Sequence, residues 1–474
     1  MSVLTNETKY TIINMKNANY SAKYIFKVVI CMNRFLLNEL IKWKARKDRK
    51  PLIVKGVRQC GKTYILKLFG KENYTEVAYF NFEGNPALAQ RFEQDLDPRR
   101  IIMELGVLNG KKINPQSTLV IFDEIQFCNN ALTSLKYFYE QTPEYHIVCA
   151  GSLLGISLSK PLSFPVGKVD FLTLRPMCFS EFVIANNEEM LLKYIESLDH
   201  KAQVPQMFAD KLTTLYKAYL VTGGMPEVVA KWVESKDIEE VERIQDAIQN
   251  SYELDFAKHA PKTDFPKLSL IWRSIPKQLS KENGKFVYSH VKPGARAKDL
   301  EDAIQWLVSA GMVCKVSRIE KPAIPLSAYS NPGYFKLYMA DVGLLRRMSK
   351  LPASSIFEES LLYSEFKGAM TENYVLNELV NLHGDQLFYW KSGNTAEVDF
   401  IAQFIEKVVP IEVKSSVNVK SRSLRVYREK YKPEIAVKTS LLNLKMEEGL
   451  LNIPLYMLWN IEKLFSFSRS IPES

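Results

Sequence analysis

Residues 56–63 decide the fold prediction, and they read GVRQCGKT: Gly56, Val57, Arg58, Gln59, Cys60, Gly61, Lys62 and Thr63. They fill every fixed position of the pattern G-x-x-x-x-G-K-[ST], after an apolar segment (Pro51–Lys55) and at the start of a helical one (Thr63–Leu68). Glycines let the backbone fold around phosphate oxygens, and N–H groups at a helix N-terminus supply partial positive charge. We therefore predict a phosphate-binding loop for ATP, in which Lys62 reaches the β- and γ-phosphates and the Thr63 hydroxyl ligates Mg²⁺.

A second motif lies about 60 residues after Lys62, where the apolar run Leu119–Phe122 ends in Asp123 and Glu124. A buried strand that ends in acid suits the other half of such a site. Asp123 would hold the metal through water, and Glu124 would orient or deprotonate the attacking water. The alternative is a buried strand with a solvated acidic end. Together the two motifs predict hydrolysis of ATP with Mg²⁺, with Lys62 and Glu124 as catalytic residues.

A third element is the apolar segment His146–Ala150, which delivers Ser152 after a glycine. Ligands of open α/β sheets sit at the carboxyl ends of the strands, so Ser152 is a candidate γ-phosphate sensor and is counted with the catalytic residues. A helix N-cap is an equally suitable role for a serine. Arg175 and Lys168 lie near the next predicted strand, and the choice of an arginine finger between them stays open.

Length and composition bound the remaining possibilities. The chain has 474 residues, and its 63 Lys and Arg against 53 Asp and Glu give a net charge of +10. The length predicts about three domains, and 46% hydrophobic residues are ordinary for a globular protein. No apolar run approaches the roughly 20 residues of a membrane span, and the six cysteines form no CxxC pair. We expect a reduced, cytoplasmic protein without a membrane partner.

Strands that alternate with helices predict an α/β fold with a mostly parallel sheet, followed by smaller domains. We expect an N-terminal extension of unknown role (1–31), a P-loop core (32–185), a helical lid (186–261) and two further segments. Residues 262–350 show a winged-helix pattern: a helix, a short strand at Phe286–His290, a helix at Lys298–Ser309 and two strands. The second helix carries Glu301 and Asp302, so we expect it to pack between domains rather than to read DNA. Residues 351–474 form a C-terminal α/β domain.

The C-terminal domain carries a set of carboxylates on neighbouring elements. Asp399 and the Glu412-Val413-Lys414 stretch lie on two successive predicted strands, and Glu372 lies in the preceding helix. Period-2 alternation places Glu412 and Lys414 on one face. Glu372, Asp399, Glu412 and Lys414 therefore form a candidate second metal site, because carboxylate oxygens suit Mg²⁺ and the lysine could position or activate water. The alternative is a pair of edge strands with a salt bridge and no catalytic activity.

These motifs, in this order, resemble a group of bacterial and archaeal AAA-type P-loop ATPases with a C-terminal domain of unknown function. The resemblance covers roughly residues 32–450 and rests on the stretches 55–63, 122–126, 150–153, 174–182, 223–227, 337–345, 397–400 and 411–414. It implies ATP binding and hydrolysis, a helical lid, a winged-helix segment and a nuclease-like C-terminal fold. The last stretches also resemble the restriction-endonuclease-like PD-(D/E)xK superfamily, with Asp399, Glu412 and Lys414 on its motif positions. Many members have Gly-Arg where this chain has Gly167-Lys168.

A basic block lies beside the candidate metal site. Lys407–Lys438 holds nine Lys and Arg and three Glu, which suits the phosphates of DNA but is also typical of a solvated helix face. Three functions remain open. The first is an ATPase that controls a C-terminal effector domain. The second is an ATP-gated, metal-dependent DNA nuclease, and the third is a slow nucleotide-dependent switch that recruits a protein partner. The oligomeric state, including a homo-oligomer, is not decided by the sequence.

Overall fold

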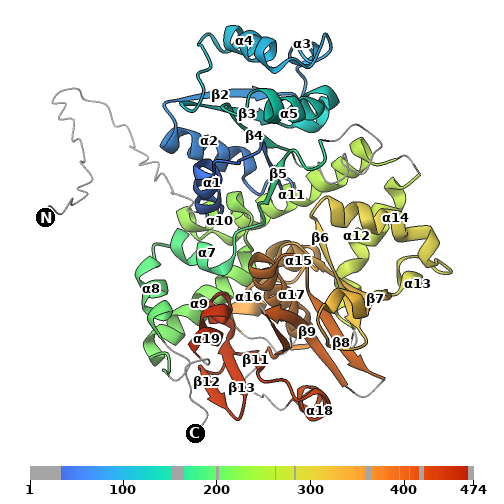
Figure 1. Ribbon diagram of the computed structural model, residues 1–474. Coiled ribbons are helices and arrows are strands. Elements are labelled where there is room, and N and C mark those ends of the chain that lie inside the picture. Colours follow the sequence, from blue (N-terminus) through green and yellow to red (C-terminus); the bar gives the residue numbers. More distant parts are fainter. Residues whose placement is uncertain are drawn as a thin grey trace, which may run out of the picture.

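The computed structural model describes residues 34–151, 165–198, 202–261, 263–281, 284–358, 364–393, 396–404, 406–415 and 421–467 (Figure 1). The predicted extension at 1–31 and the candidate sensor Ser152 lie outside the described residues. No described helix is both long enough and apolar enough to cross a membrane.

The first sheet contains β1 (Leu52–Lys55), β2 (Glu76–Asn81), β3 (Thr118–Asp123), β4 (His146–Ala150) and β5 (Asp170–Thr173). All neighbours pair in parallel, in the order β2-β3-β4-β1-β5, which confirms the predicted parallel sheet. Along β3, Leu119 and Ile121 enter one hydrophobic core, while Val120 and Phe122 enter another. Burial on both faces explains why the strand is apolar throughout instead of alternating.

Helices cover both faces of this sheet. The helices are α1 (Leu36–Ala45), α2 (Lys62–Asn73), α3 (Pro86–Gln90), α4 (Pro98–Asn109), η1 (Ile125–Phe127) and α5 (Asn129–Gln141). In Figure 1, α4 and α5 lie on one side and α1 and α2 on the other. β1 therefore ends between two helical layers, and the loop at 56–61 connects it to α2.

The segment predicted as a lid, residues 186–261, is mainly helical. It contains α8 (Glu189–Ser197), α9 (Gln206–Thr222), α10 (Pro226–Ser235) and α11 (Ile238–His259), and α7 (Phe179–Ala185) precedes it at the end of the predicted core. The predicted turn at residues 223–226 ends α9 and starts α10, with proline at the first helical position. α11 continues towards α12 (Phe265–Leu279), α13 (Tyr288–Val291) and α14 (Ala297–Ser309).

The strand predicted at Phe286–His290 is wrong, because Tyr288–Val291 forms a helical turn. Only Phe286 behaves as a strand residue, since its N–H donates to the carbonyl of Phe335 at 2.9 Å. The apolar residues of this stretch instead pack on the core through their side chains: Phe286 stacks on Phe335 with ring centroids 5.3 Å apart. Tertiary packing here outweighs a short run of β-forming residues.

The last strands form a second, mixed sheet of order β12-β13-β11-β10-β9-β8-β6-β7. Its strands are β6 (Val313–Ile319), β7 (Ser330–Met339), β8 (Phe388–Ser392), β9 (Ala396–Phe404), β10 (Lys407–Val413), β11 (Ala436–Ser440), β12 (Lys445–Glu447) and β13 (Leu450–Pro454). The predicted wing, β6 and β7, pairs with β8 and so belongs to the C-terminal sheet. The remaining helices are η2 (Leu326–Tyr329), α15 (Val342–Met348), α16 (Ala353–Phe357), α17 (Ser364–His383), α18 (Arg422–Tyr431), η4 (Leu455–Asn460) and α19 (Ile461–Phe467).

Candidate active site

The loop at residues 56–63 adopts a conformation that only glycine tolerates at two positions. Gly56 and Gly61 have φ values of +154° and +94°. A Cβ on Gly56 would lie 2.1 Å from the carbonyl oxygen of Leu174, at the end of β5. Lys62 is only 6% exposed, and its ammonium donates to the carbonyls of Gly56 and Val57, both at 2.8 Å. The backbone of the loop thus holds its own lysine across the mouth of the loop.

Thr63 and Asp123 meet as predicted. The Thr63 hydroxyl donates to Asp123 Oδ2 at 2.8 Å, and the Tyr79 hydroxyl donates to the same oxygen at 2.7 Å. Burial, together with the Asp123 carboxylate, raises the pKa of Tyr79, so the phenol stays a neutral donor. A hydroxyl and a buried carboxylate are hard oxygen donors, so this pair fits Mg²⁺. Tyr79 was not predicted from the sequence, because its partner lies on the neighbouring strand.

Glu124 is the first residue beyond β3. Its φ of +50° turns the chain out of the sheet and into η1, and its N–H donates to Asp123 Oδ1 at 3.1 Å. The Gln126 amide donates to Glu124 Oε2 at 2.5 Å, which fixes one carboxylate oxygen. Adjacent acids thus take different positions: Asp123 stays in the sheet beside Thr63, and Glu124 stands at its edge.

The variable residues of the loop contact the lid. Arg58 forms an ion pair with the buried Asp255 of α11, and Tyr252 of the same helix donates to the Arg58 carbonyl at 3.0 Å. Ser251 donates to the Gln59 side chain at 3.2 Å. Cys60 is fully buried and donates to the Leu174 carbonyl at 3.3 Å, so the thiol is a packing group of the loop.

Both arginine-finger candidates have other partners. Arg175 pairs with Asp385 at 3.0 Å, and Lys168 pairs with Glu140 at 3.0 Å. The cation that does reach the loop is Arg34, which is buried. It donates to the Cys60 carbonyl at 3.0 Å and pairs with Glu181 at 3.1 Å. No sequence motif predicts that Arg34 contacts the loop.

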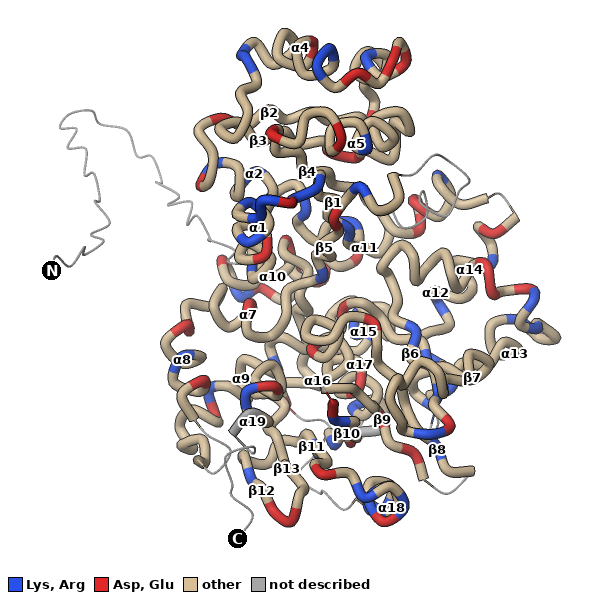
Figure 2. The backbone as a smooth tube through the Cα atoms, in the orientation of Figure 1, with Lys and Arg blue, Asp and Glu red and all other residues tan. Residues whose placement is uncertain are grey.

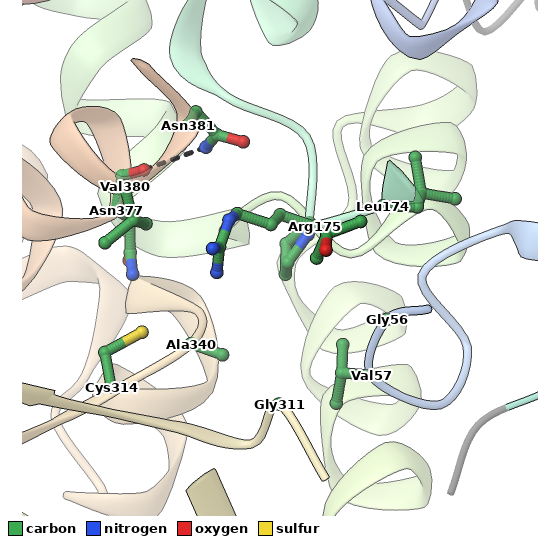
Figure 3. A pocket seen from close by; sticks show the side chains of 12 residues that line it. Gly56, Val57, Leu174, Arg175, Gly311, Cys314, Ala340, Asn377, Val380 and Asn381 are labelled. Atoms are coloured by element: carbon green, nitrogen blue, oxygen red, sulfur yellow. Dashed lines mark hydrogen bonds between the residues drawn. The ribbon is translucent and has the colours of Figure 1, made fainter. Parts of the chain in front are cut away.

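The C-terminal region packs directly on the base of the loop. A cavity of about 30 Å³ lies between the two parts of the chain, and Figure 3 shows the side chains that line it. Its lining includes Gly56 and Arg175 on one side and Gly311, Ala340 and Asn377 on the other. A Cβ on Gly311 would lie 3.5 Å from the backbone nitrogen of Val57. The phosphate loop is therefore part of the boundary between the two sheets.

The predicted C-terminal carboxylates also come together. Asp399 accepts from the Val413 N–H at 2.7 Å, and Lys414 donates to Glu412 at 2.8 Å. Glu372 accepts from Tyr338 at 3.0 Å. Burial, then the nearby charges of Glu372 and Glu412, raise the pKa of Asp399 well above its usual range. The four predicted residues thus form one cluster, with carboxylates that repel each other.

Lys336 of β7 lies within this cluster, although no sequence pattern predicts its position there. The side chain is 2% exposed, and its ammonium lies 2.7 Å from Glu397 and 3.5 Å from Glu372. In the described part of the chain, no three His, Cys, Asp or Glu side chains are arranged to hold a metal ion. As arranged, these carboxylates are compensated by an ammonium, and they do not fit a divalent cation.

Comparisons with known proteins agree with the first sheet and its loop. Residues 48–183 match the family described as an AAA domain. The chain contains an AAA domain. Residues 213–355 and 367–458 match two families that are each described as a domain of unknown function (DUF8612 and DUF4143). No curated protein matches the sequence.

Several solved structures are similar at low identity. A Walker-type ATPase of Pyrococcus abyssi is 14% identical, with a TM-score of 0.43, over 67% of this chain and 96% of that one. The ORC2 protein of Aeropyrum pernix is 14% identical, with a TM-score of 0.32, over 70% and 90% of the two chains. DnaA of Aquifex aeolicus with bound AMPPCP is 15% identical, with a TM-score of 0.27, over 58% and 85%.

One joint connects the AAA domain, the lid and the C-terminal sheet. The Met177 N–H donates to the Gly224 carbonyl at 2.7 Å, and the Gly224 N–H donates to Asp341 at 2.6 Å. A Cβ on Gly224 would lie 2.0 Å from the Met177 carbonyl oxygen, and one on Gly343 would lie 2.4 Å from that of Thr222. Burial raises the pKa of Asp341 to about 6. Three stretches that carried the family resemblance, at 174–182, 223–227 and 337–345, therefore meet at one point.

A second carboxylate reinforces this joint. Glu378 of α17 is buried and accepts from the Phe179 N–H at 2.8 Å, at the start of α7. A carboxylate at a helix N-terminus offsets the partial positive charge there. Burial nevertheless raises the pKa of Glu378 to about 8. α7, which directly precedes the lid, is thus bound to the C-terminal domain by a buried polar contact.

Proposed function

We propose that the AAA domain binds ATP with Mg²⁺ and hydrolyses it. The contact between Thr63 and Asp123, held in place by Tyr79, is the observation that carries this proposal. Mg²⁺ bound with ATP would offset the negative charge that the phosphates develop. Thr63 and Asp123 supply the oxygen donors, and Lys62 is held at the mouth of the loop where the β- and γ-phosphates are expected.

Glu124 is the proposed general base, and its position supports that role. It lies next to Asp123 but outside the sheet, and the Gln126 amide holds one of its oxygens. The other carboxylate oxygen can orient or deprotonate a water molecule directed at the γ-phosphate. Ser152 stays a proposed γ-phosphate sensor, and Lys168 and Arg175 stay open as fingers for a neighbouring subunit.

The proposed consequence of hydrolysis is control of the C-terminal domain. Arg58 reaches Asp255 of α11, and Pro226 lies 3.5 Å from the position of a Cβ on Gly61. The same turn then reaches Asp341 through Gly224. A ligand shifts a conformational equilibrium only through contacts that differ between the two states. The loop, which holds both the phosphates and these lid contacts, is where such a difference would arise.

A nuclease that is gated by ATP is the weaker proposal. Its support is the cluster of Asp399, Glu412 and Lys414, but Lys336 supplies the positive charge that a metal would supply. A slow switch that recruits a protein partner remains compatible with the same joint, and the rate of turnover separates it from a fast ATPase.

ATP binding and hydrolysis by two variants test the proposal. Lys62→Ala should abolish nucleotide binding, and Glu124→Gln should bind ATP without turnover. Glu144→Gln is the matched control, because Glu144 is an exposed glutamate before β4, at the opposite edge of the sheet. Hydrolysis by Glu124→Gln at the unmutated rate would show that Glu124 is not the base. Measuring each protein with and without single- and double-stranded DNA also tests whether DNA stimulates turnover.

A further inference from the structure

A cluster of cations surrounds the β6–β7 hairpin. Residues 277–298 include six Lys and Arg and one Glu, and β6 and its turn add Arg318 and Lys321. Figure 2 shows Lys and Arg around β6, β7 and α13. We call the following residues the hairpin surface: Lys281, Lys285, Lys292, Arg318, Lys321 and Tyr334.

Contacts between side chains join the central part of this surface. The Tyr334 ring is 38% exposed and lies between two cations, with Lys285 Nζ at 4.0 Å and the Arg318 guanidinium at 3.9 Å from its centroid. Lys281 Nζ lies 3.0 Å from the ring of His290, on α13. Lys285 of the segment between α12 and α13 and Arg318 of β6 are thus brought together on one ring of β7.

Few carboxylates compensate this charge. Within the described residues, Arg318 is the one member with an ion pair, at 3.7 Å from Glu320. In the basic block at 407–438, three cations have ion pairs: Lys407 with Glu434, Lys414 with Glu412, and Arg425 with Glu429 at 3.9 Å. Uncompensated cations repel each other, and a polyanion relieves that repulsion while releasing its own counterions.

The position of the hairpin surface favours nucleic acid. Arg318 of β6 pairs with Tyr389 of β8, and Lys336 Nζ lies 5.4 Å from the centroid of the Tyr389 ring. A Cβ on Gly284, next to Lys285, would lie 3.4 Å from Lys336 Cε. The surface therefore borders the C-terminal carboxylate cluster. α14, the helix that would enter a groove, presents Asp299, Glu301 and Asp302 at exposed positions. Contact with the phosphate backbone is thus favoured over contact with base edges.

We propose that the hairpin surface binds the phosphate backbone of duplex DNA without reading its sequence. Lysine is a flexible point charge, which suits phosphates in many positions better than it suits a fixed pattern of bases. The proposal does not depend on ATP hydrolysis. The Lys62→Ala protein should therefore retain DNA binding, and failure of the ATPase proposal would leave this one standing.

Fluorescence anisotropy with a labelled duplex of about 30 base pairs, from about 50 to 200 mM salt, tests the proposal. The variant is Lys285→Gln/Arg318→Gln/Lys321→Gln, and the matched control is Arg422→Gln/Arg425→Gln/Lys432→Gln on α18. Both remove three positive charges. Losing three phosphate contacts should lower the slope of log K against log salt by about 2.7 and weaken binding at least about tenfold, whereas the control should change little. A second duplex of unrelated sequence should bind equally.

Three results would overturn the proposal: no binding of the duplex at the lowest salt, an equal or larger loss in the α18 control, or tighter binding of the corresponding single strand. Thermal melting checks that each variant is folded. If the triple variant is unfolded, Lys281→Gln/Lys292→Gln replaces it, because both side chains are exposed. The expected change in salt slope is then about 1.8.

Discussion

Replacing Lys336 by methionine tests whether the Lys336 ammonium, rather than a metal ion, compensates the C-terminal carboxylate cluster. Methionine keeps the length of the side chain but removes the ammonium that lies 2.7 Å from Glu397 and 3.5 Å from Glu372. Removing one partner of a buried ion pair leaves an uncompensated charge and costs about 3–5 kcal/mol. At about 2–4 °C per kcal/mol, the Tm in EDTA should fall by on the order of 10 °C.

The same variant should gain affinity for a divalent cation. Without Lys336, the oxygens of Glu372, Glu397 and Asp399 are the ligands that such ions prefer. Mn²⁺ at about 100 times its Kd would stabilise the folded variant by about 2.7 kcal/mol, which restores more than half of the lost stability. Thermal melting with EDTA or Mn²⁺, together with titration calorimetry, measures both effects. The unmutated protein should show no such shift.

Two further proteins make the experiment decisive. Lys391→Met is the matched control, because Lys391 pairs with the same Glu397 at 3.2 Å but is one-fifth exposed. Its loss should cost no more than about 1 kcal/mol and create no Mn²⁺ site. Adding Asp399→Asn to Lys336→Met should remove the gained binding, which separates it from Mn²⁺ at the phosphate loop. Equal Mn²⁺ binding by the unmutated protein and Lys336→Met would refute the reasoning.

Three other predictions concern the joint and the nucleotide site. Gly224→Ala should destabilise the protein by about 1–3 kcal/mol, because its Cβ would lie 2.0 Å from a backbone oxygen, whereas Gly368→Ala, a helical position with open space, should not lower the Tm. Tyr79→Phe removes the hydroxyl that donates to Asp123 and should weaken Mg²⁺-dependent ATP binding about tenfold in titration calorimetry. Unchanged ATP binding would show that this hydrogen bond does not position Asp123. The pKa of Glu378 is raised to about 8, so the folded state keeps a proton that the unfolded state releases above about pH 4.5. The free energy of unfolding should therefore fall as the pH rises from about 4.5 to 8. Glu378→Gln should flatten this pH dependence of the Tm, and an unchanged dependence would contradict the prediction.

The sequence predicted the parts of the fold that depend on local patterns. β4 begins and ends at the predicted residues, and β3 contains the predicted apolar run Leu119–Phe122, because each is an apolar run that a polar turn closes. The loop at 56–63 follows from its own spacing. Pairing between distant segments could not be predicted from local patterns. β6 pairs with β8, about 70 residues later, and no residue pattern within β6 or β7 indicates this pairing.

The candidate sites divide in the same way. Asp399, Glu412 and Lys414 were placed together correctly, because they lie on adjacent strands of one hairpin. Lys336 enters the same cluster from β7, about 60 residues earlier in the chain, and no spacing rule connects it to Glu397. Charge compensation in a buried cluster is a property of the tertiary structure, and this one changes the interpretation from a metal site to an ammonium site.

One strand lies close to the three features that the proposals use. β7 (Ser330–Met339) carries Tyr334 of the hairpin surface and Lys336 of the carboxylate cluster, and two residues after it Asp341 accepts from the Gly224 N–H of the lid. The regular part of β7, from Phe335 to Met339, spans about 14 Å at about 3.4 Å per residue. A strand paired within a sheet bends little over this length, so we expect a displacement of the lid at Gly224 to shift the residues that border the cluster. Substitutions at Gly224 should therefore change the salt-dependent binding of DNA at Tyr334, although the two residues share no contact.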